Sequence, residues 1–314
     1  MDIKKLGSNL IKKQKVLIAT IILFIVSCFA SPVFLTGMNL SNLLLQISTY
    51  GIVSIGVMFV MLTGEFDVGV GSVLAFSGIL SVLVTNKFGY GAALALLIPG
   101  AFIIGGINAT LIDKVKFNSF VATLGAMYFY RGIGYILCDA KPVSCKNTAY
   151  AWVGTTKFLG ISMISWIFLF GILVSWFVIR KTRFGRNLMA TGGNYEVAKS
   201  SGINVSFYKY SAYIICAFCS LLAGVLLSSR LSRAVPTVGD DASMSAISSV
   251  VIGGTSMSGG EGGALQTLLG VFLMGLITNI LNTLGVVAYY QQIIKGAILI
   301  IIVCFDRFFR NRKQ

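Results

Sequence analysis

Histidine is absent from this sequence of 314 residues, and only ten residues are acidic. The absence of histidine excludes catalytic triads that need an imidazole base, and metal sites of the HExxH type. No Gly-Lys dipeptide occurs, which excludes a phosphate-binding loop of the GxxxxGK[ST] type. We therefore expect a protein that is not an enzyme, does not hydrolyse ATP by that route, and carries no metal ion or other cofactor.

Charged residues are scarce as well. They make up 11% of the chain against 56% hydrophobic residues, and the mean hydropathy is +0.87. A soluble domain normally carries about 25% charged residues to cover its surface, so most of this surface must face lipid. Because prolines number only four and no long polar stretch interrupts the chain, we expect residues 1–314 to form a single transmembrane domain.

The net charge of +15 comes from basic residues that lie between apolar runs. This arrangement is typical of lysines and arginines that flank membrane spans and set their orientation. Nucleic acid is therefore not expected as a partner. Two cysteines, Cys216 and Cys219, form a CxxC inside an apolar run and are interpreted as packing residues. Cys138 and Cys145 share a predicted external loop, where a disulfide is one open alternative.

Ten hydrophobic segments are candidates for membrane spans, because a spanning helix needs about 20 apolar residues. They are residues 16–34, 44–63, 68–85, 92–112, 119–137, 161–179, 208–229, 242–253, 265–284 and 292–305. The predicted fold class is an all-α polytopic membrane protein. The first segment resembles a signal peptide, but its length and the spans that follow favour a retained helix. Most lysines and arginines fall inside if both termini are cytoplasmic.

Two glycine-rich segments, residues 62–72 and 251–263, interrupt this pattern. Glycine allows a helix to stop at membrane depth, where the freed backbone groups need protein or water partners. The glycines expected to break the helices are Gly64, Gly69, Gly71, Gly253, Gly254, Gly259 and Gly260. Spans two to five would start outside and spans seven to ten inside, which predicts inverted repeats around a central path.

A long segment, residues 180–209, is assigned to the cytoplasm. Glu196, Ala198 and Gly202 within it have the spacing E-x-A-x-x-x-G, and we expect a short helix capped by Asn194 and ended by Gly202. Such a helix either docks into a groove of another protein or only connects two spans. Spacing alone leaves both interpretations open.

The same segment resembles the coupling-helix loop of ABC importer permeases, in the form found in the ribose and monosaccharide branch; Val197 replaces a usual alanine. Further blocks support the resemblance. Residues 62–72 resemble LTGGIDLSVGS with Glu65 at a usual glycine, residues 120–132 resemble FIVTLGT…YRG, residues 246–262 resemble AIAAVVLGGTSLSGGRG with Glu261 at a usual arginine, and residues 291–296 resemble WQQVVKG. In order, these blocks cover residues 63–306.

The resemblance implies the permease subunit of a monosaccharide ABC importer in the bacterial inner membrane, with ribose as the first choice of sugar. Its expected partners are two ATPase subunits, an external sugar-binding protein that docks on loops 139–159 and 230–241, and a second permease copy or a paralogue. The residues expected to couple the chain to the ATPase are Gly193, Asn194, Glu196, Ala198 and Gly202. Autoinducer-2 or another sugar-like solute is an alternative cargo, and an ion-coupled secondary transporter is an alternative function.

Candidates for the translocation path or its gate are Asp67, Phe76, Phe120, Tyr128, Arg131 and Lys295. Each also has a structural interpretation. Asp67 would cap the helix that starts near residue 68, while Arg131 and Lys295 would extend to the outer surface. The aromatic side chains would stack on a sugar ring or simply pack between helices. Glu65 is expected to face the cytoplasm.

Overall fold

The computed structural model describes residues 15–311. Its helices are α2 (Lys15–Ala30), α3 (Gly37–Leu62), α4 (Val70–Phe88), α5 (Tyr90–Ala95), α6 (Leu97–Asp113), α7 (Ser119–Cys138), α8 (Thr148–Thr155), α9 (Met163–Lys181), α10 (Arg183–Gly193), α11 (Tyr195–Ser200), α12 (Val205–Leu231), α13 (Ala242–Gly253), α14 (Ala264–Thr283) and α15 (Ala288–Asn311). The basic residues at positions 4, 5, 12, 13, 312 and 313, which support the predicted orientation, lie outside the described residues.

Seven helices of the described chain are long and apolar enough to cross a membrane. They are Gly37–Leu62, Val70–Phe88, Tyr90–Asp113, Ser119–Cys138, Met163–Lys181, Val205–Leu231 and Ala264–Thr283. Two shorter apolar helices, Val16–Ala30 and Ala242–Gly253, coincide with the first and eighth predicted segments, and α15 covers the tenth. A polytopic helical membrane protein is therefore confirmed. The 12 residues of α13 extend only about 18 Å, too short to cross the hydrocarbon.

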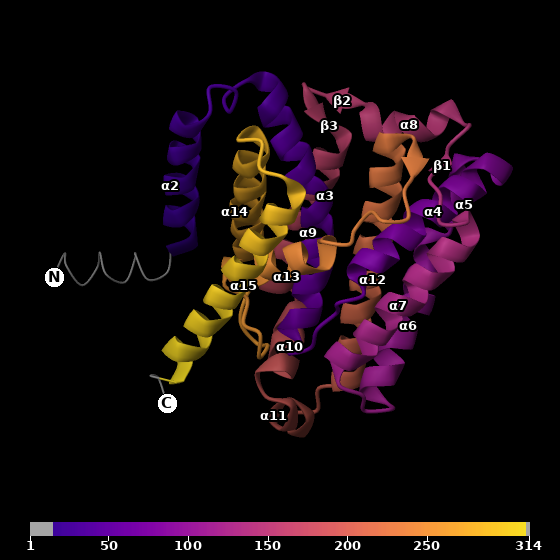
Figure 1. The fold of residues 1–314 in the computed structure, drawn as a ribbon. Helices are drawn as coiled ribbons and strands as arrows, with labels where there is room; N and C mark the ends of the chain where they lie inside the picture. The colour runs from indigo at the N-terminus through magenta and orange to yellow at the C-terminus, as the bar shows by residue number, and fades with distance from the viewer. Residues whose placement is uncertain (1–14, 312–314) are drawn as a thin grey trace.

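Four two-residue strands depart from the all-α prediction. They form two antiparallel pairs, β1 (Val143–Ser144) with β4 (Arg233–Ala234) and β2 (Lys157–Phe158) with β3 (Ile161–Ser162). Both pairs lie at the upper end of the molecule with α8 (Figure 1). The first pair ties the loop after α7 to the loop after α12, and the second is a short hairpin between α8 and α9. Cys138 and Cys145 in this region both carry free thiols.

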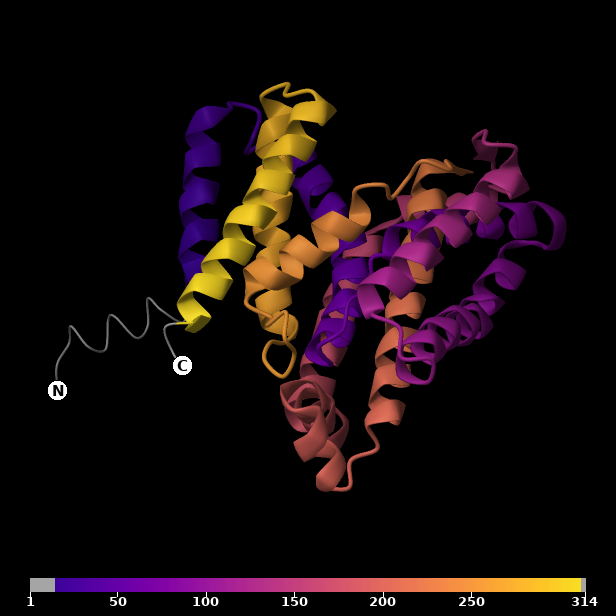
Figure 2. The same ribbon diagram turned by 60° about the horizontal axis from the view of Figure 1, so that its bottom comes forward.

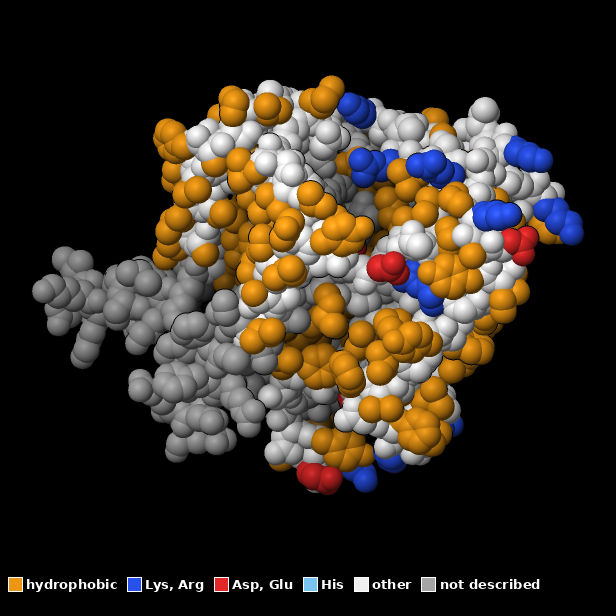
Figure 3. Space-filling model, viewed as in Figure 1, with side chains coloured by type: hydrophobic (Ala, Val, Ile, Leu, Met, Phe, Trp, Pro, Cys, Tyr) orange, Lys and Arg blue, Asp and Glu red, His pale blue; other side chains and the backbone are white. Residues whose placement is uncertain are grey.

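The helices form two groups around α3 and α12. Figures 1 and 2 show α4, α5, α6 and α7 on one side, and α2, α14 and α15 on the other, with α13 between the groups. The end of α15 and the pair α10–α11 lie at the lower end, whereas α2 starts about halfway down the molecule (Figure 1). In the face shown in Figure 3, hydrophobic side chains form a broad band, and lysines and arginines gather mostly near the upper and lower edges. This distribution fits a protein surrounded by lipid.

The centre of the bundle depends on very short distances between helix backbones. A Cβ atom added at Gly105 of α6 would lie 2.6 Å from the Cα of Ile214 in α12, and one at Gly224 of α12 would lie 2.2 Å from the carbonyl oxygen of Leu74 in α4. Cys216 and Cys219 of α12 are buried free thiols, as the packing interpretation predicts. Because lipid is as apolar as the helices, such close packing replaces the hydrophobic effect in holding them together.

Two neighbouring glycines of α6 test this packing. We expect Gly105→Ala to destabilise the protein by about 1–3 kcal/mol, because the new methyl group meets the backbone of α12. Gly106→Ala is the matched control, since a Cβ there would have no neighbour within 4 Å. Thermal unfolding of the purified chain in detergent measures the difference. Equal midpoints for the two variants would contradict the packing described here.

Candidate functional site

The segment between α9 and α12 folds into two short helices, α10 and α11, at the lower end of the molecule (Figure 2). Thr182 begins α10, where its hydroxyl accepts a hydrogen bond from the amide of Gly185 at 3.3 Å. Asn194 begins α11 by accepting from the amide of Val197 at 3.1 Å. Gly202 follows α11 with a φ of +77°, which suits glycine. The predicted cap and stop are confirmed, whereas α10 has no counterpart in the prediction.

The exposed residues of α11 include three consecutive ones at its start. Glu196 is exposed, and Tyr195 and Val197 are 38% and 60% exposed. Ala198 is buried against the rest of the chain. Of the residues predicted to meet a partner, Glu196 therefore faces outward and Ala198 faces inward.

Glycine residues connect α10 directly to both interrupted segments. The amide of Gly260 donates a hydrogen bond to the carbonyl of Leu62, the last residue of α3, at 3.1 Å. A Cβ at Gly192 would lie 2.0 Å from that same carbonyl oxygen, and one at Gly259 would lie 2.6 Å from the amide nitrogen of Gly64. We call Gly64, Gly192, Gly259 and Gly260 the glycine junction. It places the end of α10 against the loops that follow α3 and α13.

An ion pair reinforces the same end of the molecule. Lys209 of α12 contacts the carboxylate of Glu65 in the loop after α3, and their side chains are only 14% and 18% exposed. The ammonium of Lys209 also lies 5.8 Å from the centre of the Tyr195 ring in α11. Glu65 is therefore only partly exposed, because its charge is paired with that of Lys209.

Asp67 is buried in the loop between α3 and α4, with 4% of its surface exposed. Its carboxylate accepts a hydrogen bond from the amide of Gly69 at 2.9 Å, and the side chains of Asn108 and Cys216 face it. The helix begins at Val70, and the cap position belongs to Gly69 without a side-chain cap bond. Asp67 therefore holds the turn before the helix and does not occupy the cap position itself.

The second interrupted segment also stops a helix. α13 ends at Gly253, and Gly254 follows with a φ of +105°. A Cβ at Gly253 would lie 2.1 Å from the carbonyl oxygen of Gln266 in α14. The chain then turns through residues 254–263 and returns as α14. The two glycine-rich segments therefore stop helices, as predicted.

The start of α13 is surrounded by two ion pairs. Arg131 of α7 lies 2.8 Å from Asp240 and also donates to the carbonyls of Pro236 and Val238. Lys295 of α15 lies 3.0 Å from Asp241. Arg131 and Lys295 are 15% and 13% exposed, so the interpretation that they extend to the outer surface is wrong. Both cations instead bind the segment that enters α13.

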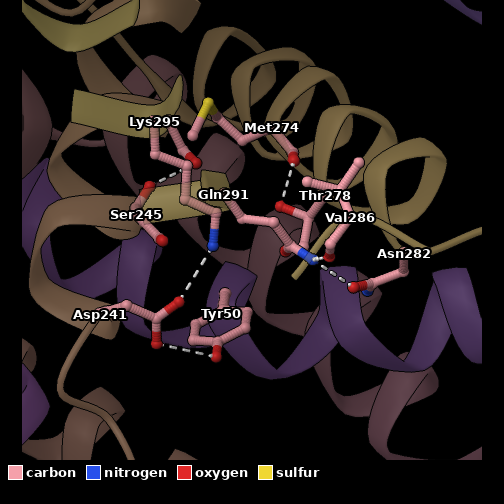
Figure 4. Close-up of polar contacts among 10 residues, drawn as sticks. Tyr50, Asp241, Ser245, Met274, Thr278, Asn282, Val286, Gln291 and Lys295 are labelled. Atoms are coloured by element: carbon pink, nitrogen blue, oxygen red, sulfur yellow. Dashed lines mark hydrogen bonds and ion pairs between the residues drawn. The ribbon is translucent and has the colours of Figure 1, made fainter. Parts of the chain in front are cut away.

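Figure 4 shows Asp241 between Tyr50 of α3 and Lys295 of α15, two residues far apart in the sequence. One carboxylate oxygen accepts from the Tyr50 hydroxyl of α3 at 3.3 Å, and the other contacts the Lys295 ammonium of α15. Nearby, the Gln291 amide donates to Asn282 and to the carbonyl of Val286 at 2.8 Å each. The contacts of Asp241 fix the start of α13 relative to the first and last thirds of the chain.

The aromatic candidates lie in different places. Phe76 of α4 is half-buried and its ring centre lies 6.0 Å from that of Tyr130, which is a packing contact. Phe120 and Tyr128 of α7 are 49% and 69% exposed. Phe120 lines a cavity of about 580 Å³ at the lower part of α7, together with Ser119 and Met257. Phe76 is therefore a packing residue, whereas Phe120 and Tyr128 are exposed.

The sequence analysis did not identify Asp240 and Asp241, the two carboxylates that pair with Arg131 and Lys295. Asp240 and Asp241 are consecutive acids in a chain with only ten acidic residues, and this rarity is the signal that could have identified them. Among the described residues, no three His, Cys, Asp or Glu side chains are grouped to hold a metal ion. The arrangement therefore offers charge pairs and close backbone contacts.

Comparison with known proteins gives consistent matches along nearly the whole chain. Residues 39–303 match the family described as the permease component of the branched-chain amino acid transport system. The ribose import permease protein RbsC of Escherichia coli K12 is 37% identical over 311 residues, which cover 96% of this chain and 94% of that protein. RbsC of Bacillus subtilis strain 168 is 38% identical over 292 residues, covering 91% and 90%.

Other relatives are named as L-arabinose permeases. The L-arabinose transport system permease protein AraH of Escherichia coli K12 is 31% identical over 301 residues, which cover 95% of this chain and 91% of that protein. No solved structure matches this chain.

A double-mutant cycle tests the ion pair at the start of α13. We expect Lys295→Met to destabilise the protein by about 1–3 kcal/mol, because it leaves the partly buried carboxylate of Asp241 without its cation. Combining it with Asp241→Asn should recover part of that loss. Thermal unfolding in detergent provides the measurement, and strictly additive effects would show that the two charges do not interact.

Proposed function

Because the chain belongs to the family of permease components of branched-chain amino acid transport systems, we propose that it is the permease subunit of a sugar importer driven by ATP. The observation that carries this proposal is the match over residues 39–303 combined with the exposed α11 helix. The chain itself lacks a phosphate-binding loop of the GxxxxGK[ST] type. ATP is therefore hydrolysed on two separate subunits.

Ribose is the proposed cargo. Two relatives named as ribose permeases are 37% and 38% identical to this chain, against 31% for one named as an L-arabinose permease. Both sugars are aldopentoses, so the class of cargo is supported more strongly than the choice between them. An external binding protein would deliver the sugar to the upper end, where Arg233 of strand β4 is exposed.

The lower end is proposed to face the cytoplasm of a bacterial cell. It carries α10 and α11 and the end of α15 (Figure 1). The ATPase would contact Tyr195, Glu196 and Val197, three exposed residues of α11. A second copy of the chain completes the importer, with the translocation path between the two copies.

The glycine junction suggests how movement of the ATPase subunits is transmitted to the membrane helices. A force on α11 reaches α10 through their single connecting residue, Asn194. The end of α10 touches the carbonyl of Leu62 and the loop of Gly259, with no side chains between them to absorb the motion. Closure of the ATPase subunits would therefore shift the loops after α3 and α13, and favour one of two states of the path.

The packing of the helices also supports inverted repeats. α4, which follows α3, packs on α12, and α13, which follows α12, packs on α3. α4 and the shorter α13 would then occupy equivalent places in repeats that run from α3 to α7 and from α12 to α15. Such repeats suit a transporter whose path opens to one side at a time.

Charge reversal at α11 tests the docking of the ATPase. We expect Glu196→Lys to reduce sugar uptake about tenfold or more, because like charges at an interface cost several kcal/mol. Uptake is measured in proteoliposomes that contain the chain, its ATPase subunits and its binding protein. Lys87→Glu, an exposed reversal at the upper end, is the matched control. Normal uptake by Glu196→Lys would contradict the docking site.

The glycine junction predicts a separate defect in coupling. Gly192→Ala should lower the number of sugar molecules imported per ATP hydrolysed, since the added methyl group displaces the loop at Leu62. Gly106→Ala of α6 is the control, because a Cβ there would have no neighbour within 4 Å. Uptake and phosphate release are measured on the same vesicles. An unchanged ratio in Gly192→Ala would exclude this route.

A further inference from the structure

Two helices begin inside the bundle with their first turns in contact. The amide of Gly71 in α4 donates to the Ser243 hydroxyl of α13 at 3.0 Å, and that hydroxyl donates to the carbonyl of Val68 at 2.6 Å. A Cβ at Gly71 would lie 2.2 Å from the carbonyl oxygen of Gly239. The starts of α4 and α13 therefore meet backbone to backbone. Interrupted helices of transporters commonly present such ends to their substrates.

A cavity of about 200 Å³ lies beside this contact. Its polar and aromatic lining residues are Ser72, Tyr128, Arg131, Tyr135, Asp240 and Ser243. They come from α4, from α7, and from the start of α13 with the segment before it, three parts of the chain that are distant in sequence. Most lipid-facing surfaces of the bundle carry apolar side chains, so this concentration of polar groups needs a separate explanation.

One lining group has an unsatisfied hydrogen-bonding capacity. Ser72 is 1% exposed, and its hydroxyl oxygen has no hydrogen-bond partner among the described residues. A buried hydroxyl without a partner is costly, and a hydroxylated ligand in the cavity would supply the missing bond. This observation points to a ligand independently of the helix ends.

The charges in the cavity restrict the chemistry of that ligand. Arg131 pairs with Asp240 at 2.8 Å, so the lining has one positive and one negative charge that compensate each other. Arg131 also donates to the carbonyls of Pro236 and Val238, which uses further donors. Asp240 stays 60% exposed and retains acceptor capacity. An anionic or cationic ligand would disturb the pair, whereas a neutral polyhydroxylated ligand would not.

We propose that this cavity is a binding site for one neutral monosaccharide ring during import, a proposal that rests on the sugar-import function. Asp240 accepts from sugar hydroxyls, Ser72 exchanges a hydrogen bond with another, and the exposed Tyr128 ring covers the apolar face of the sugar. Gly239, which contacts Gly71, also lines the cavity, and the cavity shares no lining residue with the larger one that Phe120 lines.

Ser72→Ala tests the site in the complete importer. It removes a hydroxyl that has no partner in the empty cavity, so folding should be unaffected or slightly improved. Uptake of radiolabelled D-ribose should nevertheless fall roughly three- to tenfold, the value of one hydrogen bond. Thr85→Ala is the matched control, because Thr85 is another buried hydroxyl of α4 without a partner in the described chain and it lies outside the cavity.

Chemical protection provides a second measurement. In an importer without native cysteines, Ser72→Cys is treated with a small methanethiosulfonate reagent in the presence of D-ribose or D-ribose 5-phosphate. We expect D-ribose to slow the modification and the charged sugar phosphate to leave it unchanged. Equal protection by both compounds, or protection by neither, would overturn the proposal of a site for neutral sugars.

The two possible failures are distinguishable. Absence of ribose uptake by the unsubstituted importer would contradict the proposed function, whatever the variants do. Normal uptake by the unsubstituted importer, with equal uptake by Ser72→Ala and Thr85→Ala, would contradict the cavity alone.

Discussion

The structure depends on direct contact between backbones at positions where a side chain would not fit. Helices in lipid gain little from hiding apolar surface, so they associate by close packing. α12 approaches α6 at Gly105 and α4 at Gly224, and the end of α10 approaches the loop after α3 at Gly192. The first two contacts hold the centre of the bundle together, and the third joins α10 to the lower end of the bundle.

Local signals in the sequence were sufficient for much of the fold. Long apolar runs located the spans, because the requirement for about 20 apolar residues is set by lipid and not by neighbouring helices. Asn194 and Gly202 marked the ends of α11 because capping depends on nearby backbone groups. α10 escaped prediction, since its small and charged residues carry no apolar run. The brief strands also had no visible pattern.

The charge pairs could not be predicted in the same way. Lys295 and Asp241 are 54 residues apart, and Lys209 and Glu65 are 144 apart, so their proximity follows only from how the helices pack. A lone cation near the end of a span resembles a snorkelling residue in any sequence. Ser72 similarly looks like many other serines until the cavity beside it is known. The charge pairs and the proposed cavity form only when the helices pack, so the spacing of these residues along the chain does not reveal them.

The contrast between Gly192 and Gly193 also constrains how such chains diverge. Every replacement of Gly192 places an atom against the carbonyl of Leu62, whereas Gly193 has room for a methyl group. Selection should therefore keep glycine at the first position in lineages that share this fold, and tolerate drift at the second. The side chains that line the proposed sugar cavity are not restricted in this way. Relatives can therefore keep the glycine junction and still differ in the sugar they carry.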